Sequence, residues 1–131
     1  MRNEKGFTLI EMIIVIAIIG IIAGMAIAQL QTAPKRAKEA VLKEDLYAMR
    51  DVIDQYFADK GKYPESLGTL VEENYLRRIP TDPITNSSET WQPVNAEADE
   101  NQDDPQAVGG IIDVKSGADG TALDGSRYGD W

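Results

Sequence analysis

The residues of this sequence that could do chemistry are mainly carboxylates, because it contains neither cysteine nor histidine. The absence of cysteine and histidine removes thiol nucleophiles, disulfides, the usual zinc ligands and the commonest general base. The sequence has 22 acidic and 13 basic residues, a formal net charge of −9, and the excess of acid lies in residues 59–131. Such a surface repels phosphate backbones, so we expect no nucleic-acid partner and consider a divalent cation the better candidate.

An oxygen-rich segment near the C-terminal end could hold such a cation. Residues 116–124 include Ser116, Asp119 and Asp124 among glycines that permit tight turns. Calcium takes about six to eight oxygen ligands, backbone carbonyls among them. The spacing is not that of an EF-hand, which starts with Asp-x-Asp-x-Asp-Gly and ends with Glu. The segment therefore indicates either a cation-binding loop or a pair of ordinary Asp-Gly turns.

A lone carboxylate, Glu11, precedes an uncharged apolar run from Met12 to Ala28. As a helix, residues 7–28 would be about 33 Å long, enough to cross a hydrocarbon layer of about 30 Å. A carboxylate within such a span costs about 2.5–3.5 kcal/mol by insertion scales and so needs a counter-charge. If the chain is cut after Gly6, the new amine of Phe7, especially that of a neighbouring subunit, could supply it. The alternative is an uncut signal anchor whose carboxylate reaches the membrane interface.

The residues before the span indicate its orientation. Arg2 and Lys5 lie in a short charged leader, residues 1–6, and the positive-inside rule places this leader in the cytoplasm. A secretory signal would have its small-residue cleavage site after the apolar run, whereas Gly6 stands before it. We therefore expect the span to be retained and the rest of the chain to lie across the membrane.

The polar segment after the span, residues 29–60, is predicted to continue the helix as an amphipathic one. Its apolar residues recur at spacings of three and four, which places them in one stripe: Leu42, Leu46, Met49, Ile53 and Tyr56. The repeat is too short for a coiled coil, so the stripe is expected to pack on a sheet of its own domain. The whole helix would have about 50 residues at about 1.5 Å each. Pro34, which removes one backbone hydrogen bond, is where a kink would fall.

Residues 61–131 are predicted to form a globular head. A short helix is expected at 65–76 and two strands at 90–94 and 110–114, with the acidic segment 95–106 between them as a mobile surface loop. The predicted fold class is α+β: a long N-terminal helix, membrane-spanning in its first half, packed on a small antiparallel sheet.

The junction between leader and span resembles that of type IV pilins and type II secretion pseudopilins; its residues are Gly6-Phe7-Thr8-Leu9-Ile10-Glu11. In that family a prepilin peptidase cuts before the Phe and methylates the new amine, and the Glu guides subunits into a filament. The resemblance implies these roles for Gly6, Phe7 and Glu11, and a pilin-like fold. Many relatives have a helix-breaking proline where this sequence has Ala28, so the local helix melting linked to that proline is not implied.

Later motifs are similar to major pseudopilins rather than to adhesive pilins, which usually carry a C-terminal disulfide. They are Gly61-Lys62-Tyr63-Pro64, Pro80-Thr81-Asp82-Pro83, Trp91, and the segment from Asp113 to Trp131. Resemblance to calcium-binding members implies Asp119 and Asp124 as carboxylate ligands of Ca²⁺, with Ser116 and nearby carbonyls completing the shell. The match after Gly120 is looser because this sequence is shorter there.

The resemblance implies a structural subunit of a type II secretion pseudopilus, a homo-oligomeric helical filament that drives protein export across the outer membrane. The chain would cross the inner membrane once, with its head in the periplasm. Its partners would be a prepilin peptidase, minor pseudopilins and an inner-membrane assembly platform. The alternative is a type IV pilus subunit for adhesion, motility or DNA uptake. An enzyme using paired carboxylates is not predicted, since no compact acidic constellation lies outside the turns.

Overall fold

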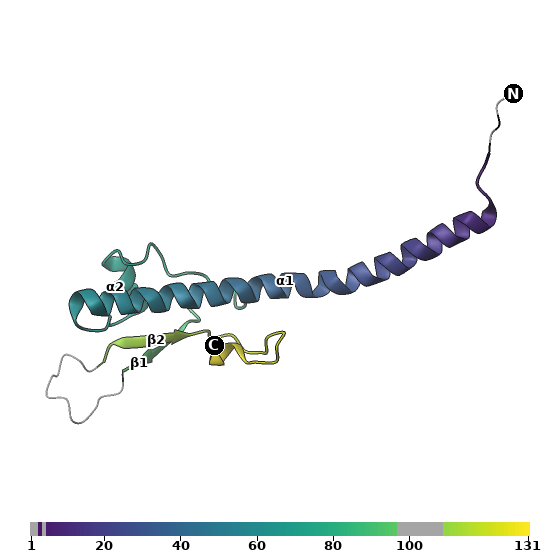
Figure 1. Ribbon diagram of the computed structural model, residues 1–131. Coiled ribbons are helices and arrows are strands. Elements are labelled where there is room, and N and C mark those ends of the chain that lie inside the picture. The colour runs from purple at the N-terminus through teal and green to yellow at the C-terminus, as the bar shows by residue number, and fades with distance from the viewer. Residues whose placement is uncertain (1–2, 4, 97–108) are drawn as a thin grey trace. The chain divides into compact units, whose positions relative to one another are not determined.

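The computed structural model of the chain describes residue 3, residues 5–96 and residues 109–131 (Figure 1). It divides into two compact units, Met1–Arg36 and Ala37–Trp131. Among the described residues the elements are, in chain order, α1 (Leu9–Lys60), α2 (Leu67–Glu72), β1 (Gln92–Asn95), β2 (Ile111–Lys115) and the 3₁₀-helix η1 (Tyr128–Asp130). The predicted α+β fold, with a long N-terminal helix and a small antiparallel sheet, is confirmed.

The two ends of α1 follow from local capping. The helix begins at Leu9, two residues after the predicted start, because the hydroxyl of Thr8 accepts a hydrogen bond from the backbone N–H of Glu11 at 3.2 Å. It ends at Lys60, where Gly61 takes a φ of 69° and its N–H bonds to the carbonyl of Phe57 at 2.8 Å. Pro34 lies inside the helix.

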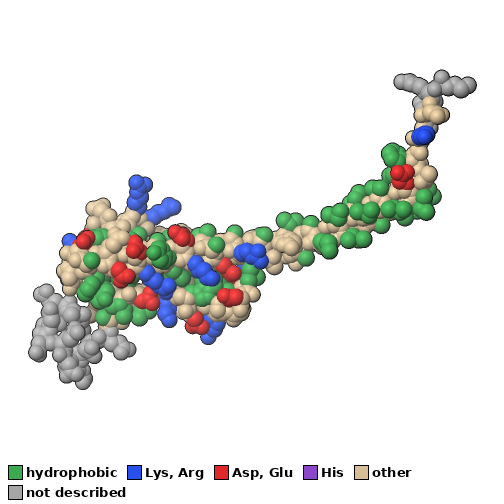
Figure 2. All heavy atoms as spheres, viewed as in Figure 1, with side chains coloured by type: hydrophobic (Ala, Val, Ile, Leu, Met, Phe, Trp, Pro, Cys, Tyr) green, Lys and Arg blue, Asp and Glu red, His purple; other side chains and the backbone are tan. Residues whose placement is uncertain are grey.

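The first unit contains the apolar part of α1. Its large apolar side chains from Phe7 to Leu30 are each between 43% and 80% exposed. Among the described residues, α1 is the one helix long and apolar enough to cross a membrane, and none of its apolar stretch is buried within the chain. Figure 2 shows these side chains, in green, along the visible face of this part of the helix, with backbone visible between them. A surface of this kind requires lipid or other protein around it.

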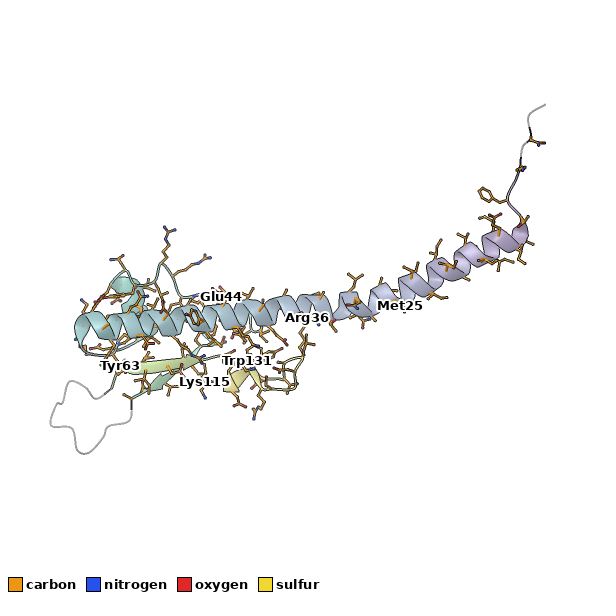
Figure 3. The ribbon with its side chains drawn as sticks, in the orientation of Figure 1. Met25, Arg36, Glu44, Tyr63, Lys115 and Trp131 are labelled. Atoms are coloured by element: carbon orange, nitrogen blue, oxygen red, sulfur yellow. The ribbon has the colours of Figure 1, made fainter. Side chains whose placement is uncertain are left out.

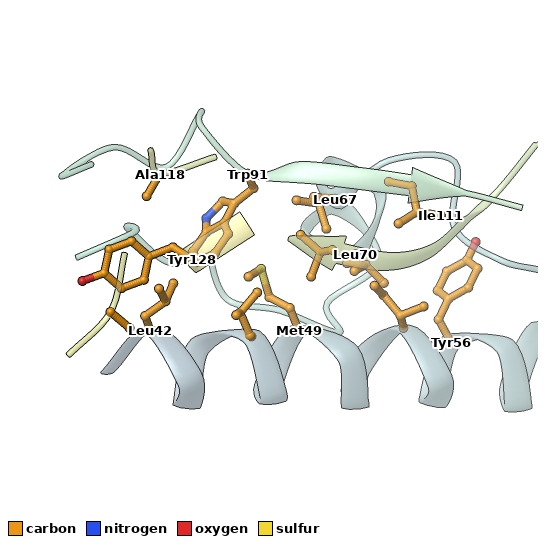
Figure 4. Packing of buried hydrophobic residues seen from close by; sticks show 13 residues of the cluster. Leu42, Met49, Tyr56, Leu67, Leu70, Trp91, Ile111, Ala118 and Tyr128 are labelled. Atoms are coloured by element: carbon orange, nitrogen blue, oxygen red, sulfur yellow. The ribbon is translucent and has the colours of Figure 1, made fainter. Parts of the chain in front are cut away.

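The second unit is built on the predicted apolar stripe of α1. All five stripe residues are buried, at 0–3% exposure, and they are Leu42, Leu46, Met49, Ile53 and Tyr56. They form one core with side chains from α2, the sheet and the residues around η1, as Figure 4 shows. The other members are Leu67, Leu70, Trp91, Ile111, Val114, Ala118, Ala122 and Tyr128. The expectation that the stripe packs on its own domain is confirmed.

The sheet consists of β1 and β2 paired antiparallel, with Gln92 opposite Lys115 and an irregularity between Val94 and Asn95. Both strands lie within two residues of their predicted positions. Ile111 and Val114 are the buried residues of β2. The segment between the strands that was predicted to be a mobile loop, 95–106, lies outside the described residues from 97 onward.

The short helix is shorter than the predicted 65–76. Ser66 starts α2 as its N-cap and accepts a hydrogen bond from the N–H of Thr69 at 3.2 Å. Asn74, with a φ of 62°, turns the chain out of the helix. Asparagine tolerates this left-handed conformation better than most residues, which explains why the helix stops before residue 76.

Candidate functional sites on the apolar helix and in the 116–128 loop

The predicted processing site lies before the start of α1. Gly6 and Phe7 are outside regular structure, and the Phe7 side chain is 79% exposed. A Cβ added at Gly6 would meet nothing within 4 Å. Among the described residues, the Gly6–Phe7 peptide bond is therefore exposed and open to an enzyme.

Glu11 lies in the first turn of α1 and is exposed. This position is favourable for an acid, since the helix dipole is positive at its N-terminus. Glu11 forms no ion pair with any other described residue. It is the single charge between Phe7 and Leu30. Once lipid or neighbouring helices surround this segment, Glu11 needs a counter-charge that no described side chain of its own chain supplies.

Residues 116–128, called here the 116–128 loop, begin with a residue that belongs to a buried polar pair. Ser116 is 1% exposed and Asp82 is 0% exposed. The Ser116 hydroxyl donates to Oδ2 of Asp82 and accepts the N–H of Ala118 at 3.1 Å. The other oxygen of Asp82 accepts N–H groups of Ile84 at 2.8 Å and Thr85 at 3.3 Å. The predicted ligand Ser116 thus has its hydroxyl engaged as donor and as acceptor, which leaves it one lone pair.

Close backbone contact fixes the next residue of the loop. A Cβ at Gly117 would lie 2.0 Å from the carbonyl oxygen of Thr90, a distance that no side chain could tolerate. Glycine is therefore required here for the loop to pack against the segment before β1.

The other two predicted ligands, Asp119 and Asp124, are both exposed. Oδ1 of Asp124 accepts the N–H of Ser126 at 2.9 Å and its hydroxyl at 2.6 Å. These hydrogen bonds, with a smaller contribution from Lys43, hold the pKa of Asp124 below its usual value. Within the described ranges no three or more acidic side chains gather as a metal site would need. A cation here would rest on two carboxylates and on backbone carbonyls.

Glu39 is a residue that positions the loop, and the sequence analysis missed it. It is 8% exposed, and its Oε1 accepts the N–H of Leu123 at 2.9 Å and the hydroxyl of Tyr128 at 2.9 Å. Burial, and then the hydrogen bond to Glu39, raise the pKa of Tyr128 to about 12. The spacing of three from Glu39 to Leu42 places the acid on the apolar stripe, and this signal could have revealed it. Glu39 thereby holds the 116–128 loop on α1.

Arg50 makes a second connection from α1. Its Nε donates to Oδ1 of Asp113 at 2.7 Å, and its Nη2 donates to the backbone oxygens of Val114 at 3.1 Å and Trp131 at 2.7 Å. The indole of Trp131 lies under the ammonium of Lys43, 4.4 Å from the ring centroid. Arg50 therefore joins α1 to β2 and to Trp131.

These features define a class of protein: a subunit with an α+β head and an exposed, wholly apolar helical segment whose one charge is Glu11. Residues 1–27 match the prokaryotic N-terminal methylation motif. The type II secretion system core protein G of Pseudomonas aeruginosa is 34% identical over 65% of this chain and 71% of its own length. The proteins of that name from Vibrio cholerae and Aeromonas hydrophila are 29% and 28% identical, over 100% and 99% of this chain and 94% of their own lengths.

The chain belongs to the type II secretion system core protein G family, the major pseudopilins. The resemblance to pseudopilins inferred from the leader junction is thus confirmed. The relatives named here carry a secretion name rather than a pilus name. The chain has no significant match among solved structures.

Proposed function

We propose that copies of this chain polymerise through residues 7–28 into the helical filament of a type II secretion pseudopilus, whose growth drives protein export across the outer membrane. The observation that carries the proposal is the exposed apolar surface of α1 from Phe7 to Leu30, with Glu11 as its single charge. Lipid covers this surface before assembly, and the helices of other copies cover it in the filament. The role is structural, with no catalytic residue assigned.

In the membrane-held state, residues 7–28 cross the inner membrane once. The leader faces the cytoplasm and the head, residues 61–131, faces the periplasm, because positive charge favours the cytoplasmic side. A prepilin peptidase removes residues 1–6 and methylates the amine of Phe7. An inner-membrane assembly platform and minor pseudopilins are the further partners. The acidic composition argues against nucleic acid as one of them.

Assembly then depends on charge pairing in an apolar core. The methylated amine of Phe7 on one subunit neutralises Glu11 of a neighbour, which removes the cost of an unpaired carboxylate. A subunit that is out of position leaves both charges unpaired. The pair therefore selects one position for each incoming copy.

The test is Glu11→Ala in cells that make no wild-type subunit. The variant should insert into the membrane as well as wild type, because a charge has been removed from the span, yet filament yield should fall to background. Glu72→Ala, an exposed acid of the head, is the matched control and should assemble normally. Filaments of wild-type abundance from the Glu11 variant would refute the pairing role.

We also propose that the 116–128 loop binds calcium, through the carboxylates of Asp119 and Asp124 and through backbone carbonyls near Ser116. The support is the exposure of both carboxylates on a loop already folded by Glu39 and Asp82. Bound calcium would add positive charge to an acidic head that has no disulfide. The protein's own residues position the loop, and the cation would stabilise it further.

Thermal unfolding of the full chain in detergent micelles tests this proposal. A cation that binds only the folded state adds about 2.7 kcal/mol at a hundredfold excess over its dissociation constant. The melting temperature should therefore be higher in calcium than in chelator, and magnesium should substitute poorly. Asp119→Ala should remove most of the difference and Asp124→Ala should reduce it, whereas Asp130→Ala, an exposed acid outside segment 116–124, should preserve it. Identical melting temperatures in calcium and in chelator would show that the loop binds no calcium and consists of ordinary turns.

A further inference from the structure

A surface groove in the second unit holds a carboxylate without a partner. The groove has a volume of about 350 Å³ and lies between α1 and the segment 76–81. Met49, Leu76 and Pro80 supply apolar lining, and Asp45 supplies the carboxylate. Asp45 is half-buried and makes no hydrogen bond or ion pair with another described residue.

The acidic residues around Asp45 make it unfavourable for this carboxylate to remain charged without a cationic partner. Burial raises the pKa of Asp45 most, and the acidic neighbours Asp82 and Glu44 raise it further. Arg78 also lines the groove, yet it forms no ion pair with Asp45 among the described contacts. A partly buried carboxylate beside two other acids gains from any cation brought to it from outside the chain.

Most of the basic residues of α1 are already engaged within the chain. Arg50 is paired with Asp113, Lys60 is paired with Glu73, and Lys43 lies on Trp131. Lys35 also has a partner of its own.

Arg36 and Lys38 remain, both exposed and without an ion pair in the described part of the chain. Arg36 precedes Asp45 by nine residues in the continuous helix α1, so the two lie about 13.5 Å apart along the axis and about 180° apart around it. Lys38 lies two turns before Asp45, on almost the same side. Figure 3 labels Arg36 and Glu44, the immediate neighbour of Asp45, on this part of the helix.

We propose that the groove beside Asp45 receives Arg36 of a second copy of this chain. The inference rests on the proposed function, because copies held by one membrane and one filament have parallel helices. In a row of parallel copies, each presents one face to the copy before it and the opposite face to the copy after it. Residues on opposite faces can therefore meet, and a stagger of about 13.5 Å brings Arg36 level with Asp45.

The chemistry of the groove suits an arginine. A guanidinium can donate two hydrogen bonds to one carboxylate, and its apolar stem can lie on the half-buried Leu76 and Pro80. Without the stagger the basic segment of one copy faces the basic segment of the next. The charge order along α1, basic at Arg36 and Lys38 and acidic at Glu44 and Asp45, thus sets the axial offset between neighbouring subunits.

Cysteine crosslinking of the full-length chain tests the contact, since the natural sequence has no cysteine. Chains carrying both Arg36→Cys and Asp45→Cys, assembled in cells and treated with a short bis-maleimide, should give a ladder of covalent oligomers. The two positions lie on opposite faces of one helix, so a crosslink within one chain is excluded. Lys38→Cys with Asp45→Cys is the matched control and should give no ladder. A ladder from the control pair alone would overturn the inference. So would the absence of a ladder from both pairs when the variant chains do form filaments.

Charge reversal supplies a second readout. Arg36→Glu alone or Asp45→Arg alone should lower filament yield by about tenfold, because like charges then meet in the contact, and the two together should restore it. Lys38→Glu should stay within about twofold of wild type, since this lysine has no assigned partner. If filaments form and the double reversal restores nothing, the contact is wrong while the proposed function stands. If the wild-type chain forms no filament with its assembly partners, the proposed function itself fails.

Discussion

Glu39 shows how one side chain can position a loop that lies far from it in the sequence. One oxygen of its carboxylate, Oε1, accepts both the Leu123 N–H and the Tyr128 hydroxyl. Glu39→Ala should lower the free energy of unfolding by about 1–3 kcal/mol, because the buried Tyr128 hydroxyl and the part-buried Leu123 N–H both lose their acceptor. Thermal or denaturant unfolding of the full chain in micelles, followed by near-ultraviolet circular dichroism, would measure the loss.

Two further variants separate the hydrogen bonds of Glu39 from its charge. Glu39→Gln keeps a side-chain oxygen at the same place and should be less destabilising than the alanine variant. Glu44→Ala removes an exposed acid from the same helix and should change the free energy of unfolding by no more than about 0.5 kcal/mol. Equal losses in the alanine variants at 39 and 44 would show that Glu39 does not hold the loop.

Tyr128 gives this contact a signature at alkaline pH. Its pKa is raised from 10.0 to about 12, first by burial and then by its hydrogen bond to Glu39. Below pH 10 the phenol is protonated in both states. Between pH 10 and about 12 the unfolded chain releases this proton and the folded chain keeps it, so the free energy of unfolding should fall as pH rises.

The measurement is the difference in stability between wild type and Tyr128→Phe across this range. Tyr56 and Tyr75 also have raised pKa values, so wild-type stability alone would mix several groups. The difference attributable to Tyr128 should shrink as the pH passes from 10 towards 12. A difference that stays constant would mean that Tyr128 titrates alike in both states.

At the scale of elements, α1 packs on the rest of the second unit through one stripe. A two-stranded sheet such as β1–β2 is marginal by itself and depends on what covers it. Leu46→Ala, at a site 2% exposed, should cost about 2–5 kcal/mol of stability, since it removes buried methyl groups and leaves a cavity. Tyr47→Ala, the next residue and 70% exposed, should change stability by no more than about 0.5 kcal/mol. Similar melting temperatures for both variants would contradict this packing.

At the scale of the whole molecule, the two units differ in the surface they present. The first exposes apolar side chains along α1, and the second buries them in its core. The first unit therefore needs a membrane or other copies of the chain around it. Intact-mass measurement of protein extracted from membranes should show a chain that starts at methylated Phe7. Assembled material that still carries residues 1–6 would contradict processing at Gly6.

Features that depend on local spacing could be read from the sequence without the structure. The uncharged run after Glu11, the stripe from Leu42 to Tyr56 and the two strands could all be predicted, because each depends on residues two to four positions apart or on unbroken composition. The leader junction is equally local, and the family match at residues 1–27 agrees with it. Local periodicity determines which face of a helix or strand is apolar, whatever the partner is.

The pairing of polar groups, by contrast, depends on how distant segments pack. Glu39 bonds to residues 84 and 89 positions away, Arg50 to Asp113 across 63, and Ser116 to Asp82 across 34. No periodicity links positions so far apart, and each contact requires segments that only tertiary packing brings together. The resemblance implied Ser116 as a cation ligand, whereas packing turns its hydroxyl towards the buried carboxylate of Asp82. The groove beside Asp45 likewise exists only because the segment 76–81 folds back along α1.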